Sequence, residues 1–291
     1  MRRDRERGTL PGMARSPVVP LELTGGPFTI DEAKRAGLTW KQLQGASWRR
    51  IAVGQYVWAG LNASPGLVLA TVRRRLPPGA VFSGQTAAWA HGLDVAQGDP
   101  VEVTVPTRSP RSAITGVLVR RADLPPDDMA FVGGLPVTSA LRTVVDLARR
   151  LPLVEAVVTA DMALHGRLVQ LAELRRFISA DGRSKGIVQL RNVVDLAEPG
   201  AESPMETRLR LLLVLAGLPR PRVQVPLYDN RGRFLGRPDL YYPLARLGLE
   251  YDGGTHRQLL RFTAADLRGS PNAVVTQVRN ALKGDASDGS P

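Results

Sequence analysis

The segment 237–256 most strongly constrains the fold, because it predicts two strands joined by a short turn. Apolar residues alternate at Leu247, Leu249 and Tyr251, and a glycine pair beginning at Gly253 ends the second strand. Alternation with a period of two is typical of a half-buried strand bounded by turn residues. We therefore expect a β-hairpin in this segment.

The length of the turn fixes which residues of this hairpin face each other. If residues 243–246 form a four-residue loop, Tyr242 pairs with Leu247 and Asp239 lies opposite Glu250. Directly opposed residues have Cβ atoms roughly 4.5–5.5 Å apart. Two carboxylates at that separation repel unless a proton or a cation lies between them, and Mg²⁺ prefers oxygen ligands. The spacing predicts a metal site.

Composition limits the class of protein. The 291 residues suit two or three domains, and the absence of cysteine excludes disulfides and thiolate metal sites. No apolar run approaches the roughly 20 residues that span a bilayer, and the N-terminus lacks the apolar stretch of a signal peptide. We expect a cytoplasmic protein with no membrane partner.

The net charge of +12 is unevenly distributed. Residues 1–75 carry 13 basic and 5 acidic side chains, residues 76–200 carry 13 of each, and residues 201–291 carry 13 basic and 9 acidic. The excess is thus +8, 0 and +4. This distribution favours two nucleic-acid-facing parts around a neutral one, although an arginine-rich genome would produce a similar composition.

Residues 1–22 are charged and rich in proline without apolar periodicity, which predicts a disordered basic arm. Capping residues then predict two short helices, from Asp31 to Ala36 and from Trp40 to Gln44, separated by Gly37. Two β-rich runs within 48–58 are hinged at Gly54 and predict a hairpin. Helix, turn, helix and hairpin indicate a winged helix-turn-helix over residues 23–75.

In a helix-turn-helix, the second helix enters the major groove and nearby basic residues contact phosphates. The groove-compatible and basic residues here, which we expect to bind DNA, are Trp40, Lys41, Gln42, Gln44, Arg49 and Arg50. Winged helices also serve as protein-interaction modules, so this alternative stays open. The stretch 28–59 resembles the N-terminal winged helix of the AbiEi family of type IV antitoxins, which are bacterial transcriptional repressors.

Residues 76–198 mix strands and helices and predict a middle α/β domain. The expected strands are 101–105 and 117–119, and the expected helices are 139–150, 153–165 and 171–178. The stretches 83–93 and 135–146 look like the middle region of AbiEi-type proteins. We find no catalytic arrangement in either stretch.

A well-delimited helix precedes the acidic hairpin. Ser203 is the expected N-cap, Pro204 the first helical residue, and Glu206 the third residue of a capping box, while Gly217 ends the helix. The capping box explains Glu206 as well as a metal-binding role would. A strand over 223–228 and a polar turn then lead to the Asp239 strand.

The order of helix, strand, strand and strand, with acids at these places, resembles the PD-(D/E)xK nuclease fold. More closely, residues 201–282 look like the family of very-short-patch-repair endonucleases. That resemblance implies Mg²⁺-dependent DNA cleavage, with Glu206, Asp239 and Glu250 as metal ligands. It implies Asp239, Glu250, Asp252 and His256 as catalytic residues.

Two features depart from the nuclease pattern. The lysine of the superfamily is absent, since Asp252 stands where it would be, and His256 would then act in proton transfer. After His256 only two residues precede Leu259–Phe262, which resembles the next core strand of the family. A parallel crossover needs about a dozen residues or more. Either this strand pairs differently, or the nuclease core is shortened.

The sequence thus predicts an α/β (α+β) multidomain chain with a winged helix and a middle α/β domain. A C-terminal restriction-endonuclease-like domain with a shortened core is expected over 199–284, and a disordered tail over 285–291. The expected function is DNA binding with a Mg²⁺-dependent endonuclease-like domain that is either active or degenerate. The alternative is a non-enzymatic AbiEi-type antitoxin that regulates transcription through its winged helix. The expected partners are DNA and, by resemblance, a cognate toxin or a second copy of the chain.

Overall fold

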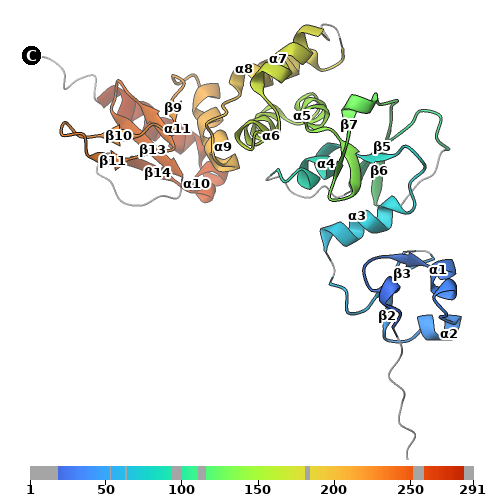
Figure 1. Cartoon of the computed structure of the whole chain (residues 1–291). Helices are drawn as coiled ribbons and strands as arrows, with labels where there is room; N and C mark the ends of the chain where they lie inside the picture. The colour runs from blue at the N-terminus through green and yellow to red at the C-terminus, as the bar shows by residue number, and fades with distance from the viewer. Residues whose placement is uncertain are drawn as a thin grey trace, which may run out of the picture. The chain divides into compact units, whose positions relative to one another are not determined.

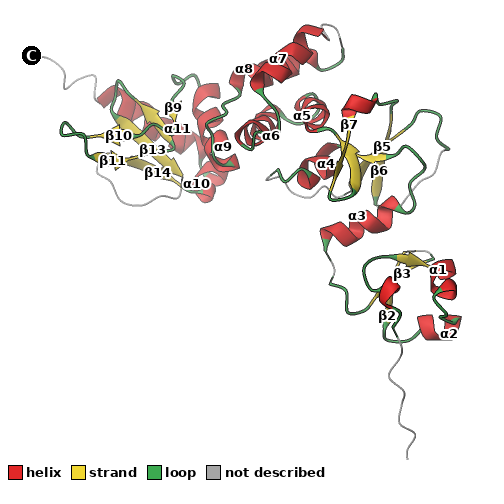
Figure 2. Cartoon of the chain, viewed as in Figure 1, coloured by secondary structure: helices red, strands yellow, loops and turns green. Residues whose placement is uncertain are grey.

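The computed structural model describes residues 19–52, 54–62, 64–93, 100–110, 116–180, 184–251 and 259–284. The chain separates into two compact units, residues 1–76 and 77–291. Both units mix helices and strands, as expected for the α/β class (Figure 2). The predicted basic arm up to residue 18 and the predicted tail over 285–291 lie outside the described residues.

The first unit contains two short helices followed by an antiparallel hairpin (Figure 1). Its elements are η1 (Leu21–Leu23), β1 (Phe28–Thr29), α1 (Ile30–Arg35), α2 (Trp40–Leu43), β2 (Trp48–Ala52), β3 (Gln55–Trp58) and α3 (Pro65–Arg73). The three strands form one sheet in the order β1-β3-β2. Gly54 has φ +70° at the hairpin turn, a conformation that glycine adopts without steric cost.

Side-chain caps start both short helices. Thr29, not Asp31 as predicted, caps α1, and its hydroxyl and backbone N–H both contact the Glu32 carboxylate. Thr39 and Gln42 form the same capping box at α2. Thr29 is the cap because strand β1 ends there with extended backbone, which is the geometry of an N-cap residue.

The last residues of the predicted disordered arm are ordered. Residues 21–23 form the 3₁₀ helix η1, and Leu23 is only 5% exposed. Its side chain packs in the small core that contains Phe28 and Leu43. Burial of one leucine against aromatic neighbours is a tertiary effect that local composition does not reveal.

The second unit begins with a five-stranded sheet in the order β6-β5-β4-β8-β7. Its elements are β4 (Val81–Phe82), α4 (Gly84–Ala90), β5 (Val101–Val105), β6 (Val117–Arg121), η2 (Pro126–Asp128), β7 (Met129–Val132) and β8 (Leu135–Thr138). Helices α5 (Ala140–Ala148), α6 (Leu153–His165), α7 (Leu171–Ala180) and α8 (Ile187–Leu196) follow. The predicted strands β5 and β6 and helices α5 to α7 are confirmed.

The last part of the second unit is a four-stranded sheet in the order β14-β13-β12-β9, with a separate hairpin β10-β11. Its elements are α9 (Pro204–Leu215), β9 (Arg222–Val223), β10 (Leu227–Tyr228), β11 (Phe234–Gly236), β12 (Leu240–Tyr242), β13 (Leu247–Tyr251), β14 (Leu259–Phe262), α10 (Ala264–Gly269) and α11 (Pro271–Gly284). Tyr242 pairs with Leu247, so the predicted register of the hairpin is confirmed.

Strand β14 lies parallel to β13, with Gly248 beside Leu259. The sequence left two alternatives for Leu259–Phe262, and the parallel pairing is the one that the structure contains. Only residues 252–258 connect the two strands, fewer than a usual crossover. The alternative in which Leu259–Phe262 pairs differently is therefore not the one that the structure contains.

Helix α9 belongs to two hydrophobic cores. Leu211 packs in the core formed mainly by α5, α6 and α8, whereas Leu209 and Leu213 pack in the core of the four-stranded sheet and α11. Figure 1 shows α9 between α6 and the sheet that contains β13. The two cores therefore lie on different faces of α9, while Leu215 at the end of the helix is exposed.

A fully buried ion pair joins α9 to α6. The side chains of Arg210 and Asp161 are both 0% exposed, and Nη2 of Arg210 lies 2.7 Å from Oδ2 of Asp161. Asp161 also accepts hydrogen bonds from the hydroxyl of Thr207 at 2.8 Å and the backbone N–H of Glu198 at 2.6 Å. Burial raises the pKa of Asp161, and the charge of Arg210 opposes that shift.

In the described part of the chain, no helix combines the length and the apolar character needed to cross a bilayer.

We predict that Arg210→Met destabilises the second unit by about 3–5 kcal/mol, because Asp161 would stay buried without its cation. The control is Arg208→Met on the same helix, whose pair with Glu155 is 33% and 44% exposed and should contribute under about 1 kcal/mol. Urea denaturation followed by circular dichroism measures both. Equal losses in the two variants would show that the buried pair has no special role.

We also predict an acid-dependent loss of stability in the first unit. Hydrogen bonds from Thr29, and then Arg74, lower the pKa of Glu32 from 4.5 to about 2. The ionised form is favoured in the folded state, so its contribution is full above pH 4.5 and is lost as the pH falls toward about 2. Unfolding of Glu32→Gln compared with the wild type should differ most near neutral pH and least near pH 2. A pH-independent difference would contradict this assignment.

Candidate functional site

A cleft of about 720 Å³ lies in the second unit between α6 and the start of α9. Glu206, Asp239 and Tyr251 line one part of it, and Leu151 and Thr159 from the helical part line another. The cleft is therefore the place where two of the predicted metal ligands come together.

Gln224 joins these two acids. Its side-chain Nε2 donates hydrogen bonds to Oε2 of Glu206 and to Oδ1 of Asp239, each at 3.1 Å. Its backbone N–H also donates to the carbonyl of Asp239 at 3.1 Å. The amide thus lies between two of the three carboxylates that the sequence analysis expected to bind a cation.

Gln224 explains why the predicted strand over 223–228 is broken. The residue has φ +51°, a left-handed backbone that is uncommon outside glycine. Strands β9 and β10 end and begin on either side of it. A backbone outlier of this kind persists where surrounding contacts fix it, and here these contacts are the hydrogen bonds to Glu206 and Asp239.

Each of the two acids also accepts a hydrogen bond from a backbone N–H, Asp239 at its other oxygen and Glu206 at the same oxygen that binds Gln224. The backbone N–H of Tyr251 donates to Oδ2 of Asp239 at 2.8 Å, and the backbone N–H of Glu202 donates to Oε2 of Glu206 at 3.0 Å. Ser203 caps α9 as predicted, but Glu206 completes only half of the expected capping box, because its carboxylate binds the N–H of Glu202 instead of that of Ser203.

Glu250 has a different neighbour. It pairs in register with Arg261 on the adjacent strand, and Nε of Arg261 lies 3.8 Å from its Oε2. That oxygen is buried and accepts no hydrogen bond from the described residues. The register of β12 and β13 continues toward Asp239 and Glu250, as predicted, but each of these acids has its own partner.

The described donor set does not fit Mg²⁺. Within the ranges that the structure describes, no three His, Cys, Asp or Glu side chains come together to hold a metal ion. N–H donors bind both oxygens of Asp239 and Oε2 of Glu206. Asp252 and His256, the other predicted catalytic residues, lie outside the described residues, so their roles stay predictions.

The predicted DNA-binding residues share one property in the first unit. All six side chains on or beside α2 and β2 are exposed: Trp40, Lys41, Gln42, Gln44, Arg49 and Arg50. Some already have partners. Nη2 of Arg49 donates to the carbonyl of Leu61 at 2.9 Å, and Oε1 of Gln42 accepts from Thr39 in the capping box. Gln42 therefore retains only its NH₂ group for contact with a base edge.

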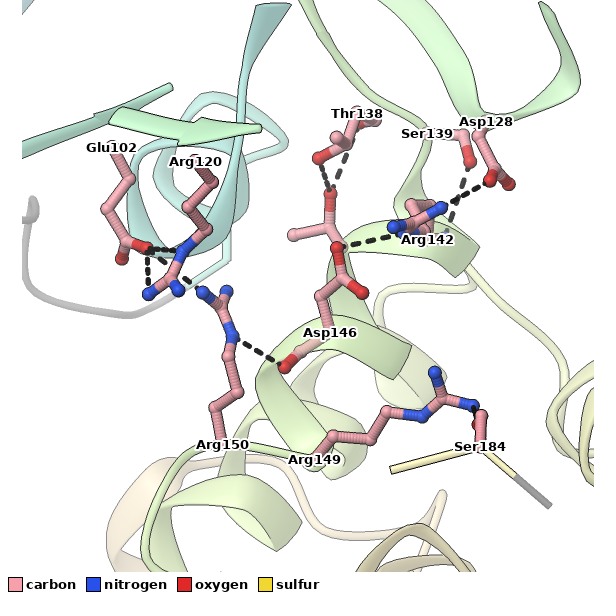
Figure 3. Close-up of polar contacts among 11 residues, drawn as sticks. Glu102, Arg120, Asp128, Thr138, Ser139, Arg142, Asp146, Arg149, Arg150 and Ser184 are labelled. Carbon is pink, nitrogen blue, oxygen red and sulfur yellow. Dashed lines mark hydrogen bonds and ion pairs between the residues drawn. The ribbon is translucent and has the colours of Figure 1, made fainter. Parts of the chain in front are cut away.

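Sequence reasoning missed a polar cluster around Glu102 of β5, which is only 8% exposed (Figure 3). Its Oε2 lies 3.4 Å from both Arg120 of β6 and Arg150 after α5, and its Oε1 accepts from the backbone N–H of Gln85. Gly84 has φ +57°, and a Cβ there would lie 2.3 Å from Oε2. Glycine at position 84 is the sequence feature that could have indicated this cluster.

This cluster has a structural role. Arg150 also donates to the carbonyl of Asp146, which in turn binds Arg142, so the network joins α4, α5, β5 and β6 (Figure 3). Burial, and then the neighbouring Arg120, lower the pKa of Arg150. Each charged group in the network has an opposite charge or a backbone partner.

We predict that Gln224→Ala lowers the free energy of unfolding at neutral pH by about 1.5–3 kcal/mol, because two ionised carboxylates lose their shared donor. The control is Gln224→Gly, whose loss should be smaller by about 1 kcal/mol, since glycine accepts the left-handed backbone. Thermal unfolding of each variant gives the comparison.

The same position provides a metal test. Gln224→Glu adds a third carboxylate beside Glu206 and Asp239, and millimolar Mg²⁺ should raise the melting temperature of this variant but not of the wild type. Equal stabilisation of both proteins by Mg²⁺ would contradict the conclusion that the amide occupies the cation position.

Comparison with known proteins supports part of the resemblance found in the sequence. Residues 70–196 match the AbiEi antitoxin C-terminal domain family. Uncharacterized proteins from two strains of Mycobacterium tuberculosis are 29% identical over 200 residues, which is 67% of this chain and 72% of each relative.

Among solved structures, the RV2827C protein of M. tuberculosis matches with a TM-score of 0.42 and 16% identity, over 70% of this chain and 84% of that chain. The comparisons give no support for the very-short-patch-repair resemblance of residues 201–282. Residues 70–196 are therefore similar to the AbiEi antitoxin C-terminal domain.

Proposed function

We propose that this protein is a DNA-binding regulator of the AbiEi antitoxin type, which contacts duplex DNA through α2 and β2 of its first unit. The observation that carries the proposal is the exposure of all six predicted contact residues on a unit with an excess of eight positive charges. The AbiEi match makes DNA or a toxin the class of partner. We choose DNA because polar and basic side chains suit base edges and phosphates.

Under this proposal the six residues have different tasks. Lys41 and Gln44 extend from α2, which corresponds to the recognition helix of a winged helix-turn-helix. Arg49 and Arg50 lie on β2, where they would contact phosphates and fix the register of the protein on DNA. Trp40 is 57% exposed and packs edge to face on Tyr56, with ring centroids 6.4 Å apart, so a hydrophobic contact to a thymine methyl is its expected role.

DNA cleavage is not part of the proposal. The acids that would bind Mg²⁺ are joined by the amide of Gln224, and Glu250 faces Arg261. The C-terminal region would then be a nuclease-like domain without catalysis. Mg²⁺-dependent nicking of plasmid DNA by the wild type, and not by Asp239→Ala, would overturn this part.

We predict that changing Lys41, Arg49 and Arg50 together to Ala weakens duplex binding and reduces its salt dependence. Each lost phosphate contact lowers the slope of log affinity against log salt by about 0.9, so the slope should fall by up to about 2.7. Fluorescence anisotropy of a labelled duplex measures both quantities.

The matched control changes Lys34, Arg35 and Arg73, three exposed basic residues elsewhere in the first unit, to Ala. It removes the same charge but should keep most of the affinity and slope. If both triple variants lose affinity equally, binding depends on net charge and not on α2 and β2.

A further inference from the structure

The hairpin β10-β11 exposes three large apolar side chains to water. Tyr228 is 58% exposed, Phe234 61% and Leu235 52%. Phe234 and Leu235 are neighbours in one strand, so their side chains point to opposite faces of the hairpin. Because both are more than half exposed, the rest of the described chain covers neither face.

The two aromatic rings form a pair on one face. Tyr228 and Phe234 lie directly opposite each other across the strands, with ring centroids 5.8 Å apart and an interplanar angle of 67°. This edge-to-face arrangement leaves ring surface accessible to a planar ligand. Exposed rings of this kind are unusual on a protein surface unless they contact something.

Asp229 holds the turn in shape. Its Oδ1 accepts from the backbone N–H groups of Arg231 at 2.8 Å and Arg233 at 2.9 Å, and its Oδ2 lies 2.6 Å from Nε of Arg233. These bonds, first those from Arg233, lower the pKa of Asp229. A two-stranded hairpin alone is only marginally stable. The hydrogen bonds of Asp229 hold the turn in one conformation, and this lowers the entropy that the hairpin loses when a ligand binds.

The hairpin is basic as well as aromatic. From Leu227 to Arg237 it contains three arginines and one aspartate, a net charge of +2. The single acid is engaged within the turn. Arg231 and Arg233 are exposed at the tip, whereas Arg237 at the base lies 2.9 Å from Glu202.

Exposed rings beside exposed arginines match the chemistry of a nucleic-acid strand, in which bases alternate with phosphates. A protein partner with an apolar groove would use the rings but not the cations. Paired bases inside a duplex present only their edges, so stacking on a ring requires an unpaired base.

We propose that the hairpin β10-β11 is a binding site for single-stranded nucleic acid. An unpaired base stacks on Tyr228 or Phe234, and a neighbouring phosphate contacts Arg231, since Arg233 is held by Asp229. This site is independent of the duplex contacts proposed for the first unit.

The test uses the full chain with Lys41, Arg49 and Arg50 changed to Ala, so that the first unit contributes little. Fluorescence anisotropy with a labelled oligothymidylate of about 20 nucleotides measures the affinity. Replacing Tyr228 and Phe234 together by Leu keeps apolar volume but removes both rings, and should weaken binding at least about tenfold. Arg231→Ala should lower the salt slope by about 0.7.

Three controls make the result specific. Leu235→Ala changes the opposite face and should alter affinity less than twofold. Tyr228→Phe keeps the ring and should bind like the parent, which separates stacking from a hydroxyl contact. A duplex of matched length should bind more weakly than the single strand.

Unchanged affinity in the double Leu variant would overturn the proposal, and so would an equal loss in Leu235→Ala, which indicates a general apolar contact. Tighter binding of the duplex would overturn the single-strand assignment. Loss of duplex binding in the Lys41, Arg49 and Arg50 variant concerns the first unit alone, so the two proposals fail separately.

Discussion

The buried pair of Arg210 and Asp161 is the interaction on which the second unit depends. Removing two charges from water costs several kcal/mol per ion, and their attraction offsets that cost only with good geometry and further hydrogen bonds. Further hydrogen bonds are present here. Asp161 accepts from the hydroxyl of Thr207 and the N–H of Glu198, and Arg210 donates to the carbonyl of Leu196. An apolar pair could give equal stability, but it would accept several registers. A charged pair accepts one.

That single register explains the position of the cleft. Glu206 precedes Arg210 by four residues, one turn along α9. Fixing Arg210 against α6 therefore fixes Glu206 at the cleft, where it meets Gln224 and Asp239. It also directs Leu211 into one core and Leu209 into the other. The geometry of the acids is thus a consequence of a contact between residues 49 positions apart.

This dependence separates what the sequence could predict from what it could not. Local signals were sufficient for α9, with its cap at Ser203, and for the hairpin register set by the loop 243–246. They failed at Gln224, whose left-handed backbone follows from two acids distant in sequence. Neither the Arg210 pair nor the Glu102 cluster has a local pattern, because an arginine in a helix usually reaches solvent and the partner is set by tertiary packing.

The same contacts limit where nucleic acid can bind. The region 76–200 contains equal numbers of basic and acidic residues, and its partly buried arginines are engaged internally, Arg142 by Asp128 and Asp146 and Arg150 by Glu102. Arginines held by internal carboxylates are unavailable to phosphates. The exposed basic residues that we propose as contacts for a polyanion lie on α2 and β2 of the first unit and on the hairpin β10-β11. Residues 76–200 carry no net charge, so the nucleic-acid contacts that we propose lie in the parts on either side of them in the sequence.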